Sequence, residues 1–429
     1  MNSGEKIRIL EAADQLGIGG TELALENFCR NLDKSRFDIT VAGFREGGVR
    51  EEILRNLGFD VIIASTDAEI WRNLLQKADV LHWHGCGILE ADVFEPIRQA
   101  KPALVIQTNV FGLSDDTAYY DLVDLDLYIS EMCLVRRARG SNGNFDHLKH
   151  KCSVLYYPVD LARLEKNMPS AQDAAACRKE LGLGNSPTVG RTGRSVDKIH
   201  PVSFHMMRRL IRWIPDVKFL LVGYTDKMQE LAAQLGIQDH FVWVEPTADL
   251  KTLLTYYKSM DVYLGTSIMG ESFGMSIAEA MACRLPVVAV STPDADNAQI
   301  ELVDNGKTGL VIQAYPRLVA LACKELLLNE KRRREMGEAG FQKVQIFSAD
   351  LITRALENII LQKMGIGNQK RINNPTNNLL PAMWDRNMES EYRRRLADLY
   401  ARPRFTDKLG MGMRHYGGRF KAKMSRIFG

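Results

Sequence analysis

Two glutamates enclose a turn of small residues where a helix is expected to begin. The segment reads Glu271-Ser-Phe-Gly-Met-Ser-Ile-Ala-Glu279 and continues into Ala-Met-Ala. A helix start offers free backbone N–H groups and the positive end of the helix dipole, which together favour an anion. Carboxylates at this spacing are common on solvated helix faces, but Gly274 also permits close approach of the backbone to a ligand. The segment therefore predicts a site for phosphate and sugar hydroxyls together, as in a nucleotide sugar.

A basic loop follows the strand that we predict at residues 188–190. It contains Arg191, Arg194 and Lys198. Loops at the carboxyl ends of parallel strands line the ligand crevice, and Arg and Lys are suited to phosphate oxygens. We expect Arg194 and Lys198 to stabilise the charge that develops on a departing diphosphate, with Arg191 as the alternative partner of Lys198. The simpler reading is a solvated basic loop.

A glycine loop opens the first predicted helix. It reads Gly17-Ile-Gly19-Gly20 and follows the first predicted strand. The dinucleotide-binding pattern G-x-G-x-x-G is not met, and a tight turn would also explain these glycines. We expect Gly19 and Gly20 to let the backbone approach the donor phosphate from the first domain.

Two histidines alternate at the end of the strand predicted at residues 80–83. His82 and His84 share one face of that strand, as two metal ligands would. Without a third ligand at a suitable spacing, we predict no metal there. His84 is instead a candidate for the lining of an acceptor pocket, and polar capping of the strand end is an equally good reading.

Length and composition indicate an ordinary globular protein of more than one domain. The chain has 429 residues, 45% hydrophobic and 25% charged, and no apolar run long enough to cross a bilayer. Seven scattered cysteines without a Cys-x-x-Cys pair favour reduced thiols. We see no signal peptide and expect a cytoplasmic protein.

The end of the chain carries the positive charge. From Arg386 onward there are twelve Lys/Arg and four Asp/Glu, whereas the net charge of the whole chain is only +3. Arginines such as Arg402 and Arg404 alternate with apolar residues, so this tail is a candidate for peripheral contact with the anionic inner face of a membrane. A partner-binding segment and a loosely folded tail are alternatives, and no base-reading motif indicates nucleic acid.

Short apolar runs alternate with helical patterns along most of the chain. This alternation predicts an α/β fold with two Rossmann-like doubly wound domains in series, facing a cleft. We expect an N-terminal acceptor domain at 1–160, a donor-binding domain at 161–348, a helix at 349–365 and a linker with the basic tail at 366–429.

The segment from Glu271 to Ala289 resembles the signature of retaining GT-B glycosyltransferases of the family 4 type, also called glycosyl transferases group 1. That signature is E-x7-E followed by E-A-M-A and a P-V-V-A strand, and Arg284 stands where the family usually has glycine. The segment Glu301-Leu-Val-Asp-Asn-Gly-Lys-Thr-Gly-Leu310 and the glycine loop at residues 19–22 extend the resemblance.

The resemblance implies roles for individual residues. Glu271 would contact the donor sugar, Glu279 would hold the ribose hydroxyls, and Val244 would border the base. The backbone N–H groups that would face the sugar and the distal phosphate belong to Phe273, Gly274 and Met275. Asn109 stands where many relatives carry a histidine that faces the acceptor, and asparagine cannot act as a general base. The helix at 349–365 would cross back to the first domain.

The implied function is retaining transfer of a sugar from a UDP- or GDP-sugar to an acceptor hydroxyl, in glycan, glycolipid or polysaccharide biosynthesis. The acceptor would be a glycan, a lipid-linked molecule or a small molecule. We expect no cofactor and no divalent metal, because no Asp-x-Asp motif is apparent. The alternatives are a nucleotide-sugar 2-epimerase of the same fold, a Rossmann oxidoreductase, and a catalytically silent nucleotide-sugar-binding subunit.

Overall fold

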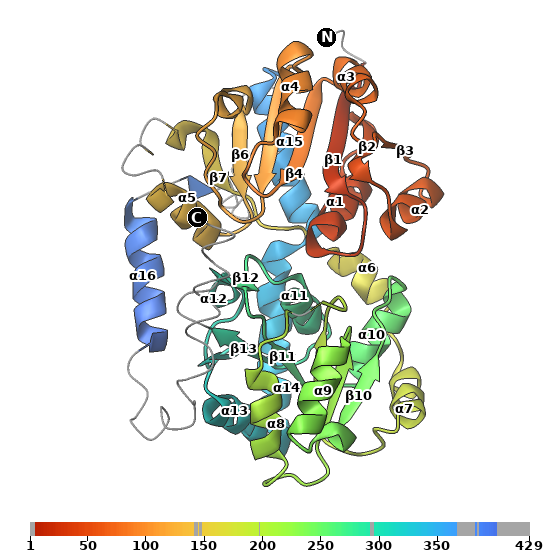
Figure 1. Cartoon of the computed structure of the whole chain (residues 1–429), viewed down its shortest axis with the longest axis vertical. Helices are drawn as coiled ribbons and strands as arrows, with labels where there is room; N and C mark the ends of the chain where they lie inside the picture. The colour runs from red at the N-terminus through yellow and green to blue at the C-terminus, as the bar shows by residue number, and fades with distance from the viewer. Residues whose placement is uncertain are drawn as a thin grey trace.

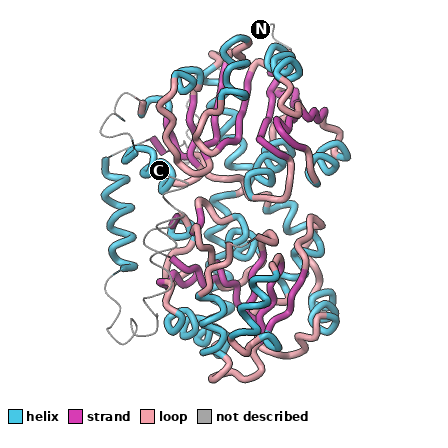
Figure 2. Tube along the Cα trace, viewed as in Figure 1, coloured by secondary structure: helices cyan, strands magenta, loops and turns pink. Residues whose placement is uncertain are grey.

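The computed structural model describes residues 5–140, 145, 148–196, 198–291, 296–366, 382–383 and 386–400. These residues form two α/β domains that lie one above the other, each with helices on both faces of its sheet (Figures 1 and 2). The predicted fold class of two doubly wound domains is confirmed.

The first domain is built on an eight-stranded sheet, parallel except for its last edge strand. In spatial order its strands are β16 (Ala382–Met383), β7 (Cys152–Val154), β6 (Leu125–Tyr128), β5 (Leu104–Asn109), β4 (Val80–Gly85), β1 (Ile7–Gln15), β2 (Phe37–Glu46) and β3 (Asp60–Ile63). Its helices are α1 (Gly20–Asn31), α2 (Val49–Asn56), α3 (Ala68–Lys77), α4 (Ala91–Gln99) and α5 (Glu131–Gly140). The chain reverses its winding direction between β1 and β4, where doubly wound sheets bind ligands beyond the strand ends.

The second domain repeats this plan on a six-stranded sheet. In spatial order its strands are β10 (Phe241–Val244), β9 (Lys218–Val222), β8 (Thr188–Thr192), β11 (Val262–Gly265), β13 (Val287–Ser291) and β15 (Gly309–Gln313). A separate short pair is formed by β12 (Gly270–Glu271) and β14 (Asp296–Asn297). The helices are α7 (Ala171–Glu180), α8 (Val202–Leu210), α9 (Asp226–Gln234), α10 (Leu250–Lys258), α11 (Met275–Ala282), α12 (Gln299–Leu302), α13 (Pro316–Leu328) and α14 (Glu330–Val344).

Continuous apolar runs form the central strands because helices cover both faces of each sheet. All five residues of β13, Val-Val-Ala-Val-Ser, are buried, and so are all six of β5. Side-chain caps fix several helix starts, such as Asp67, which accepts the N–H groups of Glu69 and Ile70 at the start of α3.

The chain crosses between the domains twice, at adjacent positions. The first crossing leads into α6 (Leu161–Lys166), and the second leads into α15 (Ala349–Lys363). Two backbone hydrogen bonds join the crossings at Val159: Ala349 N–H donates to Val159 O, and Val159 N–H donates to Phe347 O, both at 2.8 Å. The helix expected at 349–365 is therefore α15, and it packs against α1 and into the core of the first domain.

Beyond α15, the described part of the tail is β16 and α16 (Arg386–Tyr400). This helix lies along α5 of the first domain and β15 of the second (Figure 1). Tyr392 is buried there, and Arg395 forms an ion pair with Glu131 of α5. Of the basic tail predicted to contact a membrane from Arg386 onward, Arg393, Arg394 and Arg395 lie in this helix. The basic residues at 401–429, including Arg402 and Arg404, lie outside the described residues.

All seven cysteines lie in the described ranges and are free thiols, as predicted. No helix among the described residues combines the length and the apolar character that crossing a membrane requires.

Candidate functional site

The start of α11 faces the glycine loop of the first domain. Gly274 adopts the left-handed φ of 104° at the N-cap, a conformation that favours glycine. A Cβ atom built on Gly20 would lie 3.4 Å from Cγ of Met275, the first residue of α11. A Cβ on Gly19 would meet the carboxylate of Glu22, which would have to shift. The structure thus brings together the two backbone elements predicted to approach one phosphate group.

The Phe273 side chain belongs to the hinge between the domains rather than to a ligand site. It is 2% exposed and contacts the rings of Tyr156, Tyr157 and Phe347. Only its backbone is available for the contact predicted with the sugar or the phosphate.

Glu271 lies directly beside this helix start. A Cβ on Gly274 would lie 3.7 Å from the Cβ of Glu271, and the backbone carbonyl of Glu271 accepts the N–H of Ala298 at 2.9 Å. Burial raises the pKa of Glu271 to about 7, while the charges of Arg191 and Lys198 oppose that rise. A carboxyl group with this pKa changes its charge near neutral pH.

The three cations predicted to bind phosphate occupy different environments. Arg191 is buried, and its Nε donates to Thr266 O at 2.9 Å. Partial burial and then the charge of Arg194 lower the pKa of Lys198, whereas Glu271 and Glu22 act to raise it. Arg194 itself is exposed. The charge of Arg191 thus favours the ionised form of Glu271. Arg194 and Lys198 lie toward solvent.

Glu279 faces a cavity between the two domains. Burial raises the pKa of its carboxyl group, and the Tyr257 hydroxyl donates to its Oε2 at 2.7 Å. The cavity is bordered by Ile18, Leu23, Asn27, Arg50, Val159, Asp160, Arg163, Leu164, Thr247, Ala248, Leu250, Leu253, Met275 and Glu279. Its walls come from α1 and α2 on one side and from α10 and α11 on the other.

Val244 ends β10 close to this cavity. Its carbonyl accepts the N–H of Gly223 at 2.8 Å, and the cavity wall begins three residues later at Thr247. The predicted base-binding segment therefore leads into the same cavity as Glu279.

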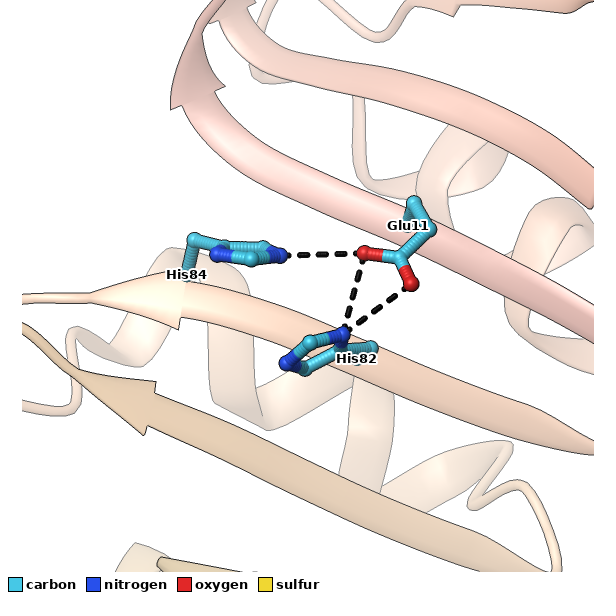
Figure 3. A group of neighbouring side chains, drawn as sticks. All are labelled: Glu11, His82 and His84. Carbon is cyan, nitrogen blue, oxygen red and sulfur yellow. Dashed lines mark hydrogen bonds and ion pairs between the residues drawn. The ribbon is translucent and has the colours of Figure 1, made fainter. Parts of the chain in front are cut away.

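The two residues predicted to face an acceptor have buried side chains. Asn109 accepts the N–H of Gly112 at 2.8 Å and donates to Leu113 O at 3.2 Å, so its amide holds its own loop. His84 is 2% exposed and bonds to Glu11 through Nε2 at 3.0 Å (Figure 3). Because both side chains are buried, the structure gives no support to their contact with an acceptor.

Residues without a local sequence signal also shape the site. Asp296 accepts the Ser272 hydroxyl at 2.6 Å and forms an ion pair with Arg136 of α5, in the other domain. Arg50 and Arg163 both pair with the buried Glu26 at the cavity. The members of these ion pairs are 24 to 160 residues apart in the sequence. The sequence analysis did not identify them, because it relied on local patterns.

Comparison with known proteins agrees with this geometry. Residues 182–343 match the family model described as Glycosyl transferases group 1. A D-inositol 3-phosphate glycosyltransferase of Thermomonospora curvata is 36% identical over 113 residues, which cover 26% of this chain and 25% of that protein. The chain thus spans about a quarter of the length of that curated relative.

Two solved structures share most of the fold at low sequence identity. Anabaena Alr3699/HepE, crystallised with UDP and glucose, matches with a TM-score of 0.68 and 17% identity over 83% of this chain and 100% of that one. A putative UDP-N-acetylglucosamine 2-epimerase from Listeria monocytogenes matches with a TM-score of 0.56 and 12% identity, over 89% and 100%. The fold is therefore GT-B, as the sequence predicted.

Proposed function

We propose, starting from the glycosyl transferases group 1 domain that residues 182–343 form, that the chain is a retaining glycosyltransferase that uses a nucleotide-diphosphate-sugar donor. One observation carries the proposal: Glu271, the cationic loop and the bare start of α11 meet opposite the glycine loop of the other domain. A diphosphate with a sugar attached has the charge and the hydroxyls that this arrangement suits.

The donor would bind with its nucleoside in the cavity and its diphosphate at the helix start. Glu279 would accept hydrogen bonds from the ribose hydroxyls, with the base near Val244. Gly20 and the N–H groups of Gly274 and Met275 would surround the phosphates. This orientation is supported by the position of Met275, which borders the cavity and also contacts the glycine loop.

Catalysis would rest on position and charge. The bond between the anomeric carbon and the diphosphate breaks, while the acceptor oxygen bonds to that carbon on the same face. The acceptor proton passes to a phosphate oxygen, so no protein base is needed. Arg191 or Arg194 and Lys198 would stabilise the departing diphosphate, and Glu271 would position the sugar. The mechanism includes no divalent metal.

The acceptor and the cellular location are part of the same proposal. A glycan, a lipid-linked molecule or a small molecule would donate its hydroxyl, in polysaccharide or glycolipid biosynthesis. The cytoplasm is proposed from the seven free thiols, and peripheral contact with an anionic membrane from the basic residues from Arg386 onward. Equal sedimentation with anionic and neutral vesicles would contradict the membrane contact.

A thermal-shift screen of the full chain against UDP-, GDP-, ADP- and TDP-sugars tests donor binding, because a ligand that binds the native state raises the melting temperature. We expect one donor to raise it, and Lys198→Ala to weaken the shift. Lys307→Ala, an exposed lysine of the same domain, is the matched control. No shift with any nucleotide sugar would contradict the proposal.

A nucleotide-sugar 2-epimerase is the second candidate, because a protein of that description shares the fold over its whole length. Incubation of the protein with the donor alone, without an acceptor, distinguishes the two activities. An epimerase converts the bound sugar without an acceptor, whereas a transferase leaves the sugar configuration unchanged and needs an acceptor for turnover.

A further inference from the structure

Glu11, His82 and His84 form a cluster on one face of the sheet of the first domain (Figure 3). Glu11 lies on β1 and the two histidines on the adjacent strand β4, where Glu11 pairs with His82 and Ala13 with His84. Residues two apart on a strand share a face, so both imidazoles point to the same side as the carboxylate. The side chains of all three are fully shielded from solvent.

The ligand atoms of this cluster converge on one point. His82 Nδ1 and His84 Nε2 each lie 3.0 Å from an oxygen of Glu11, and one ligand atom from each residue lies within 4.8 Å of the other two. The ring of Phe28 packs on both imidazoles, with centroid distances of 5.4 and 5.9 Å. A carboxylate in such an apolar setting needs a compensating positive charge.

The second nitrogen of His82 is also held in place. His82 Nε2 lies 2.8 Å from the Thr108 hydroxyl on β5. When Nε2–H donates to this hydroxyl, the lone pair of Nδ1 points toward Glu11. An outer partner that fixes the tautomer and the ring orientation is the usual companion of a metal-binding histidine.

We propose that Glu11, His82 and His84 bind one zinc ion through a carboxylate oxygen and the two imidazole nitrogens that face it. Two imidazoles and one carboxylate are a common zinc-binding set, and tetrahedral coordination at about 2.0–2.2 Å separates the ligand atoms by roughly 3.4 Å. Here each imidazole nitrogen lies 3.0 Å from a Glu11 oxygen, and all three ligand atoms lie within 4.8 Å of one another. Replacing the protons between Glu11 and the two imidazoles by a zinc ion therefore requires only small side-chain shifts.

The ion would have a structural role. It would join β1 to β4 at the point where the winding of the sheet reverses, and β1 leads into the glycine loop. The sequence predicted no metal at this site, because only His82 and His84 were apparent as ligands. Glu11, which lies 71 residues from His82, supplies the third.

Metal analysis of the full chain tests the proposal without reference to activity. Protein produced in zinc-supplemented medium, or refolded with Zn²⁺ and dialysed, is analysed by inductively coupled plasma mass spectrometry. We expect one zinc per chain, and a visible d–d spectrum of tetrahedral type after refolding with Co²⁺. A refolded wild-type chain that holds no zinc and shows no cobalt spectrum would overturn the proposal.

Variants locate the ion. Thr108→Val keeps the three ligands and the shape of the core, and we expect it to weaken zinc affinity about 10- to 100-fold. Glu11→Gln and His84→Asn should abolish retention, and His150→Ala, an exposed histidine, should retain the full amount. Equal zinc content in wild type, Glu11→Gln and His84→Asn would place any bound metal elsewhere and overturn the assignment.

Discussion

The ionisation of Glu271 gives the activity an expected pH dependence. Its pKa is raised to about 7, chiefly by burial. If the ionised carboxylate positions the sugar, kcat/KM for the donor rises between about pH 6 and 8 and then levels off, because protonation removes the charge. Glu271→Gln is expected to lower activity and to flatten this rise.

The pH profile of kcat/KM for the donor is the measurement. Glu338→Gln removes an exposed carboxylate of the same domain and serves as the control, which should keep the wild-type profile. A Glu271→Gln enzyme with the wild-type rise would assign the pH dependence to another group.

The φ of Gly274 makes a second prediction possible. Gly274→Ala forces a side chain into a left-handed conformation, which costs about 1 kcal/mol or more. Gly236, with a φ of 64° and open space around it, is the matched control. Both variants should melt at lower temperature, but only Gly274→Ala should also lose donor affinity, measured by calorimetry. Equal donor affinity in the two variants would contradict a ligand contact at Gly274.

Single residues could be predicted from the sequence where the chemistry is local. Glu271, Gly274 and Glu279 lie in one short segment with a recognisable spacing, at and along the start of α11, and Glu279 borders the cavity. Arg284, where the family usually has glycine, adopts a φ of 59° at the end of α11, which explains that preference. Asp296 could not be predicted, because its role depends on Arg136, a partner 160 residues away.

Among the secondary-structure elements, α5 of the first domain is hydrogen-bonded to the second domain. Glu301 of α12 accepts the N–H groups of Glu131 and Met132 at 2.9 and 3.0 Å, so a carboxylate of the second domain caps a helix of the first. Removing the acceptor leaves buried N–H groups unpaired, at a cost of about 1–3 kcal/mol. Glu301→Ala is therefore expected to lower the melting temperature and to loosen the contact between the domains.

The charge of Glu301 gives this contact a pH dependence. Burial raises its pKa from 4.5 to about 7, so the folded state binds the proton more tightly than the unfolded state does. The resulting stabilisation is complete below about pH 4.5 and is lost as the pH rises toward 7. Melting curves at several pH values should show wild type losing stability relative to Glu301→Gln across this window. A constant difference would contradict the raised pKa.

Most core strands were predictable because their residues are continuously apolar. The strand predicted at residues 80–83 is the start of β4, and the one predicted at 188–190 is the start of β8. The four-residue strand β6 was not predicted. It contains Asp126, whose carboxyl group is satisfied only after folding by Gln107, Tyr120 and Tyr128.

On the scale of the whole molecule, the first domain depends on α15, a helix that follows the second domain in the chain. Ile352, Leu356 and Ile360 of α15 are buried in its core, each contributing roughly 1.5–3 kcal/mol by burial of apolar surface. A fragment of residues 1–344 should therefore melt at a much lower temperature than a fragment of residues 1–366, which retains α15. Circular dichroism measures both, and equal melting temperatures would show that α15 does not stabilise the first domain.

The doubly wound plan and the return of α15 could be predicted from the alternation of patterns and from the family resemblance. The placement of α16 could not. Its contacts with α5 and β15 join segments that are distant in sequence, through Tyr392 and the ion pair of Arg395 with Glu131, and composition alone suggested only a basic tail.

The antiparallel strand β16, which pairs with β7, has a consequence for synthesis of the protein. A nascent chain leaves the ribosome from its N-terminus, so β7 is translated more than 200 residues before its edge partner. During that interval the sheet presents an open hydrogen-bonding edge and a core that lacks one helix, a combination prone to aggregation. Chaperones that bind early nascent chains should therefore matter more for the folding of this protein than its compact final form would suggest.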